Sequence, residues 1–212
     1  MRAFRDPASA LTHLLGALLS AAGLVLLLVA AQRGSIWHLL SFAIFGITLI
    51  LLYTTSTLYH ALRLSEQGIR TLRKLDHGAI FLLIAGTYTP FCLIPLRGPW
   101  GWALLGTIWG LAAAGIVVKA FWMGAPRWLS TLLYVLMGWL VLIAFVPLVR
   151  SAPREAVAWL VAGGLIYTLG AVIYALKWPN LWPGRFDFHA VWHLFVMGGS
   201  ISHFLAVYQL IG

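Results

Sequence analysis

The sequence predicts an all-α integral membrane protein, a bundle of seven transmembrane helices with a cytoplasmic N-terminus and an external C-terminus. The first observation is composition: 62% of the 212 residues are hydrophobic and only 9% are charged. The mean hydropathy is +0.94, whereas soluble domains are roughly half apolar. Most of this chain therefore belongs in a bilayer. The other two observations are the length of the apolar runs and the distribution of basic residues.

Seven apolar runs are long enough to cross a membrane, because a transmembrane helix needs about 20 predominantly apolar residues. They cover residues 10–31, 37–60, 76–96, 100–121, 128–149, 156–176 and 188–211. The loops between them are short and contain turn residues such as Gly98-Pro99, so successive helices should run antiparallel. We expect one domain over residues 1–212 and a multi-pass location in the cell membrane.

Basic residues predict the orientation, because Lys and Arg are retained on the cytoplasmic side of short loops. Of the fourteen basic residues, ten fall on the side of the N-terminus: Arg2, Arg5, Arg63, Arg70, Arg73, Lys74, Lys119, Arg127, Lys177 and Arg185. The other side has Arg33, Arg97, Arg150 and Arg154. Because the basic residues are scattered singly, nucleic-acid binding is not expected. With Cys92 as the only cysteine, intramolecular disulfides and thiolate metal clusters are excluded.

Four ionisable residues are predicted to lie at one depth, near the cytoplasmic boundary. His60 ends the second run, Asp76 begins the third, and His189 and His193 begin the seventh. Ionisable groups inside membrane segments are costly and usually functional. Ser56, one turn before His60, lies on the same helix face. These residues are therefore the candidate site.

The histidines fit a zinc ion. His189 and His193 are four residues apart, which places both imidazoles on one helix face, and His60 supplies a third from another helix. Three imidazoles with an open fourth position are typical of catalytic zinc. Asp76 would orient a ligand or accept a proton from water, and Ser56 would hydrogen-bond that water or a substrate oxygen. The alternatives are interfacial histidines, a serine bonded to its own helix and an acid favoured at a helix N-terminus.

The same residues lie in segments that resemble the hemolysin III family, the bacterial branch of the progestin and adipoQ receptor family. The matching segments are LTHLLG at 11–16, STLYH at 56–60, DH at 76–77, AGTYTPF at 85–91 and HAVWHLF at 189–195. The resemblance implies seven helices, a cytoplasmic N-terminus and zinc held by His60, His189 and His193, with Asp76 and Ser56 in the same site. The sequence departs at Asp6 and Ser9, where family members often have Glu and Asn, so no role is carried over to that segment.

Three functions from different classes follow. The first is a zinc-dependent membrane hydrolase that cleaves an amide or ester bond of a lipid, with Asp76 assisting the attacking water. The second is a non-enzymatic sensor or regulator of membrane lipids, in which zinc ties two helices together. The third, a pore-forming haemolysin, ranks last because the helices offer no polar pore-lining stripe. In each of the first two, a membrane lipid is the expected partner. The oligomeric state and the roles of His13 and His203 are left open.

Overall fold

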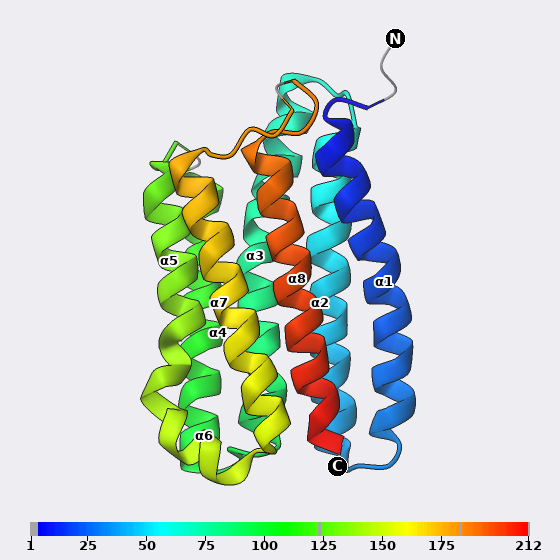
Figure 1. Cartoon of the computed structure of the whole chain (residues 1–212). Coiled ribbons are helices and arrows are strands. Elements are labelled where there is room, and N and C mark those ends of the chain that lie inside the picture. The colour runs from blue at the N-terminus through cyan, green and yellow to red at the C-terminus, as the bar shows by residue number, and fades with distance from the viewer. Residues whose placement is uncertain (1–3, 123, 183, 212) are drawn as a thin grey trace.

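The computed structural model describes residues 4–122, 124–182 and 184–211, and its regular elements in these ranges are helices apart from one isolated bridge between Trp182 and Phe186. The helices run roughly side by side in one bundle, with the two ends of the chain at opposite ends of it (Figure 1). They are α1 (Pro7–Ala31), α2 (Ile36–Ala61), α3 (Glu66–Leu93), α4 (Pro99–Phe121), α5 (Arg127–Trp139), η1 (Leu140–Ala144), α6 (Phe145–Ser151), α7 (Arg154–Leu176), α8 (Phe188–Tyr208) and η2 (Gln209–Ile211).

Six segments of the described chain are long and apolar enough to cross a membrane: α1, α2, α4, the combined segment Arg127–Ser151, α7 and α8 with η2. The helix that does not meet this criterion is α3, which packs against α2 and α4. The predicted run 76–96 is only its apolar half. The helix starts ten residues earlier because Ser65 caps it by accepting the Gly68 N–H, and Arg70 pairs with Glu66 one turn away at 3.4 Å.

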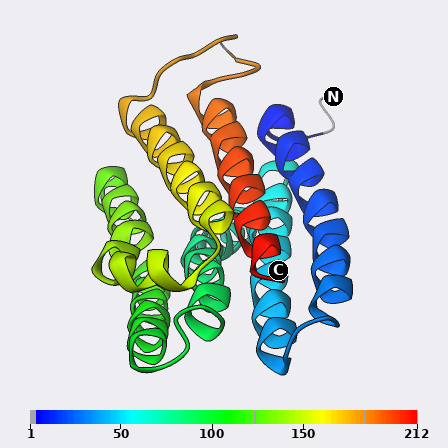
Figure 2. The same ribbon diagram turned by 60° about the horizontal axis from the view of Figure 1, so that its bottom comes forward.

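The predicted helix 128–149 is broken, although the prediction took no account of Pro147 inside that run. It consists of α5, the 3-10 segment η1 and α6. Two features cause the break. Pro147 has no N–H to donate and clashes with the carbonyl group four residues earlier, which lies in η1. The Tyr88 hydroxyl of α3 accepts the Val141 N–H at 2.8 Å and lies 2.8 Å from the carbonyl oxygens of Met137 and Gly138. A side chain inserted into the ladder of backbone hydrogen bonds breaks a helix at that point. Figure 2 shows the resulting bend between α5 and α6.

The helices α1, α2 and α8 pack closely at small residues. Gly16 of α1 lies against the ring of Tyr53 on α2, where an added Cβ would be 2.5 Å from Cδ1. The Tyr53 hydroxyl donates to Ser200 Oγ of α8 at 2.7 Å, and Ser200 Oγ is also 2.8 Å from the Tyr167 hydroxyl of α7. This contact holds α1, α2 and α8 together next to the candidate site.

Candidate metal centre

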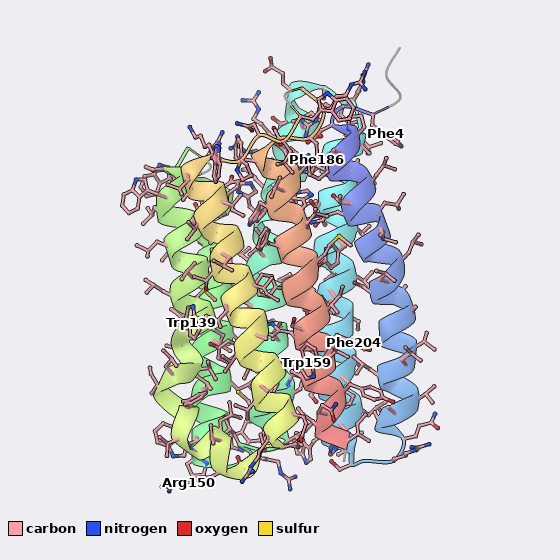
Figure 3. The ribbon with its side chains drawn as sticks, in the orientation of Figure 1. Phe4, Trp139, Arg150, Trp159, Phe186 and Phe204 are labelled. Carbon is pink, nitrogen blue, oxygen red and sulfur yellow. The ribbon has the colours of Figure 1, made fainter. Side chains whose placement is uncertain are left out.

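The three candidate ligands come from two helix ends at the N-terminal end of the bundle. His60 lies in the last turn of α2, and His189 and His193 lie in the first two turns of α8. Asp187 caps α8, because its Oδ1 accepts the N–H groups of His189 at 3.0 Å and Ala190 at 3.2 Å. The helix therefore begins just before His189, which places His189 and His193 on one face. In Figure 3, Phe4 and Phe186 mark this end of the bundle and Arg150 marks the other.

The three imidazoles approach closely enough to bind a metal ion. His60 Nε2 and His189 Nε2 are 3.2 Å apart. One ligand nitrogen from each of His60, His189 and His193 lies within 4.8 Å of the others. Nitrogens about 2.0–2.1 Å from one tetrahedral zinc ion are roughly 3.4 Å apart. The first pair already has this spacing, so small ring rotations would bring in the third nitrogen.

Groups outside the cluster engage the opposite ring nitrogens of His60 and His193. Asp6 Oδ2 lies 3.0 Å from His60 Nδ1. His193 Nδ1 lies 3.3 Å from the Ser9 carbonyl oxygen and 3.3 Å from Thr12 Oγ1. Metal-binding histidines commonly donate their second N–H in this way, which fixes the tautomer and leaves the other nitrogen free. His193 Nε2 is buried and has no hydrogen-bond partner among the described residues, as expected of the nitrogen by which a histidine binds a metal ion.

The segment before α1 is held against the end of α2, and this positions Asp6. The Asp6 N–H donates to the His60 carbonyl oxygen at 2.9 Å, and the Arg5 guanidinium donates to the Tyr59 carbonyl oxygen. Asp6 also caps α1 by accepting the Ser9 N–H at 3.4 Å. Burial would raise the pKa of the Asp6 carboxyl, but hydrogen bonds from His60 and Ser9 outweigh burial and lower that pKa to about 2. Asp6 is therefore ionised beside His60.

His13 supports the cluster from α1. Its ring stacks on His193 with the centroids 3.5 Å apart and the planes within 8°. The Tyr53 ring also contacts the His13 ring edge-on, with the centroids 4.9 Å apart. His193 is thus held by ring stacking as well as by the hydrogen-bonding groups of α1.

Asp76 and Ser56 are both buried near the three histidines. Ser56 lies one turn before His60 on α2. The Asp76 carboxyl on α3 lies close to His60 and to the Ser56 side chain. Asp76 also lines an internal cavity, together with His13 and His189. Beyond these polar groups the cavity wall is largely aliphatic and aromatic, with residues from α3, α4, α5, α7 and α8. Of the three candidate ligands, His189 lines this apolar space.

Comparison with known proteins identifies the family of the chain. Residues 1–204 match the family model described as "Haemolysin-III related". The chain belongs to this family. It is 43% identical to Hemolysin-3 of Bacillus cereus, over 94% of this chain and 89% of the relative. It is 44% identical to the Hemolysin-3 homolog of Bacillus subtilis (strain 168), over 94% and 91%. The human Monocyte to macrophage differentiation factor is 26% identical over 82% and 71%.

The resemblance found in the sequence is confirmed, and this haemolysin-III-related protein is a multi-pass protein of the cell membrane. The residues that sequence reasoning missed are Asp6, Ser9 and Thr12, which contact the ligand histidines from the start of α1. Asp6-Pro7 is a typical helix start, so the sequence indicates where α1 begins. It does not show that this start contacts α2 and α8. His203 lies apart from the cluster, with Nε2 3.2 Å from the Leu160 carbonyl oxygen.

Proposed function

We propose that this protein is a zinc-dependent membrane hydrolase that cleaves an amide or ester bond of a lipid. The observation that carries the proposal is the convergence of His60, His189 and His193 near a buried carboxyl group, Asp76, which lines an apolar cavity together with His189. Neutral imidazoles suit zinc, whereas magnesium and calcium prefer oxygen ligands. The proposed ligands are His60, His189 and His193.

A zinc ion in such a site supplies Lewis acidity, which polarises a carbonyl group and activates water near neutral pH. The residues of the chain have the other roles. Asp76 accepts the proton of the attacking water, and Ser56 donates a hydrogen bond to a substrate oxygen. Asp6 holds the His60 ring in place through Nδ1. The apolar cavity receives the hydrocarbon part of the lipid, so that its amide or ester bond lies next to Asp76.

Metal analysis combined with a hydrolysis screen tests the proposal. Purified wild-type protein should contain one zinc ion per chain and hydrolyse at least one lipid amide or ester. Asp76→Asn should keep its zinc and lose hydrolysis, while His193→Ala should lose most of both. His38→Ala, a histidine at the other end of α2, is the matched control and should retain both.

A lipid sensor with structural zinc predicts a different pattern. His193→Ala would then lower thermal stability, Asp76→Asn would leave function intact, and no lipid would be hydrolysed. Stoichiometric zinc in all three of His60→Ala, His189→Ala and His193→Ala would rule out the site itself, and with it the reason for assigning an enzyme.

We also propose that the whole chain is one domain of seven membrane-spanning helices, with α3 as the span that composition alone does not identify. The packing of α3 against α2 and α4 and the ten-to-four division of basic residues support this topology. Reporter fusions test it. Alkaline phosphatase should be active after residue 211 and inactive in the loop between α2 and α3, and a cytoplasmic fluorescent reporter should show the opposite. Phosphatase activity in both places would contradict the topology.

A further inference from the structure

The cavity next to the candidate metal centre carries a positively charged group of residues near its polar end. Three basic residues line it: Arg73 of α3, Lys119 of α4 and Arg127 of α5. Asp76 is the one carboxylate in the lining formed by the described residues. Cations therefore outnumber carboxylates by three to one around this part of the cavity.

Lys119 is the unusual member of this group. It is only 5% exposed, although it lies in the last turn of α4, where a lysine would normally reach water. No hydrogen bond or ion pair joins its ammonium group to any residue that the structure describes, and the nearby Arg73 repels it. Its ammonium nitrogen is not among the buried polar atoms that lack a partner, so the aliphatic stem is covered while the charged end keeps accessible surface. The C-terminal end of the α4 dipole favours a cation at this position.

Retention of basic residues on the cytoplasmic side explains Arg73 and Arg127, which are both exposed, but does not explain a buried lysine. Lys74, next to Arg73, shows the ordinary case, because its side chain is exposed and does not line the cavity. The side chain of Lys119 is covered, but its ammonium nitrogen keeps accessible surface and Lys119 lines the cavity, so an anionic partner in the cavity would reach it.

We propose that Lys119, with Arg73 and Arg127, binds the oxyanion of an anionic lipid headgroup, a phosphate or a carboxylate, whose hydrocarbon chain occupies the apolar cavity. Charge-assisted hydrogen bonds from an ammonium and two guanidinium groups suit such an oxyanion. A neutral headgroup would leave Lys119 unpaired, and the cation of a zwitterionic headgroup would be repelled. This inference deepens the proposed function by naming the class of lipid, and it rests on that function only for the cleavage of the lipid.

Lipid binding to the purified full-length protein, measured by native mass spectrometry without turnover, tests the inference. The probes are phosphatidylglycerol and phosphatidylcholine with identical chains, oleate and inorganic phosphate. Wild-type protein should bind phosphatidylglycerol about tenfold more tightly than phosphatidylcholine, the effect of one charge-assisted hydrogen bond. Lys119→Met should abolish this preference, while Lys119→Arg and the matched control Lys74→Met should keep it. If Lys119→Met does not fold, Arg127→Gln should still reduce the preference about threefold.

The probes distinguish the sources of the oxyanion. Binding of oleate that depends on Lys119, without a preference for phosphatidylglycerol, would identify the oxyanion as a carboxylate. Binding of inorganic phosphate alone would overturn the lipid assignment. Equal binding of all the lipids by the wild type, or an unchanged preference in Lys119→Met, would overturn the inference.

The outcomes also separate this inference from the proposed function. Anionic lipid that binds through Lys119 and is never hydrolysed would leave the inference standing and remove the enzyme. Hydrolysis of lipids regardless of headgroup charge would support the enzyme and overturn this inference.

Discussion

Two sides of the bundle differ in how closely their helices approach. On the side of α1, α2 and α8, an added Cβ at Gly16 would lie 2.5 Å from the Tyr53 ring. On the side of α5, the cavity lies between the helices, and α5 contacts its neighbours α3 and α7 at few positions. The broken segment of α5, η1 and α6 also belongs to this second side, where the cavity lies. We call these the packed side and the open side.

The difference corresponds to a division of tasks. All three candidate ligands, and Asp6, Ser9 and His13 that contact them, come from the packed side. A metal site needs ligands held to within about 0.5 Å, which close packing provides. A cavity for flexible hydrocarbon chains needs less exact walls, and α3, α5 and α7 provide most of them. The largest expected effects of substitution should therefore fall on the packed side.

Gly16→Ala should have the largest effect on stability. Its new methyl group would overlap the ring of Tyr53, which is only 2% exposed and bonded to Ser200, so it has little freedom to move. Overpacking of this kind costs about 2–3 kcal/mol. We expect a clearly lower thermal unfolding midpoint in one fixed detergent. An unchanged midpoint would show that α1 and α2 separate easily and that the packed side is not rigid.

Asp6→Asn should have the next largest effect, seen in the metal rather than in the fold. Asn keeps the size of the side chain but removes the charge beside His60 Nδ1. Loss of an outer partner weakens metal affinity by about tenfold or more, which equals about 1.4 kcal/mol. Competition with a chelator measures this affinity, and Glu66→Gln, an exposed acid on α3, is the control. Equal zinc affinity in Asp6→Asn and wild type would exclude Asp6 from the site.

The sequence predicted the helical membrane fold and placed the ligand residues at a common depth, because apolar length and basic loops are local properties. It placed His189 and His193 on one face from their spacing alone. It did not predict that α3 extends back to Glu66, because that half is polar and the helix depends on the Ser65 cap.

Contacts between distant segments could not be predicted. Pro147 marks the broken segment locally, but the Tyr88 hydroxyl that bonds to it belongs to a residue some fifty positions away in the chain. The role of Asp6 depends on the chain before α1 meeting the end of α2. Both follow from packing, which periodicity and spacing do not specify.

Tyr88→Phe tests the open side with a smaller expected effect. The substitution removes the oxygen that accepts the Val141 N–H and leaves that group without its partner. One hydrogen bond contributes about 1 kcal/mol to stability. We expect a modest fall in the unfolding midpoint, with zinc content unchanged because the change lies away from the ligands. Tyr208→Phe, at an exposed tyrosine near the end of α8, is the control. Loss of zinc in Tyr88→Phe would show that the two sides are coupled.

Gly106→Ala should have the smallest effect, and it forms a matched pair with Gly16→Ala. Both substitutions add one methyl group to a membrane helix, but Gly106 is exposed and its new Cβ would meet no atom within 4 Å. Replacing glycine by alanine in an open helical position stabilises by about 0.5–1 kcal/mol, because the unfolded chain loses freedom. We therefore expect an unfolding midpoint equal to or slightly above that of the wild type. A loss as large as that of Gly16→Ala would contradict the outward-facing position of Gly106. Because Gly106 and Gly110 have the spacing that lets helices approach closely, such a loss would mean that a helix of a second molecule covers α4.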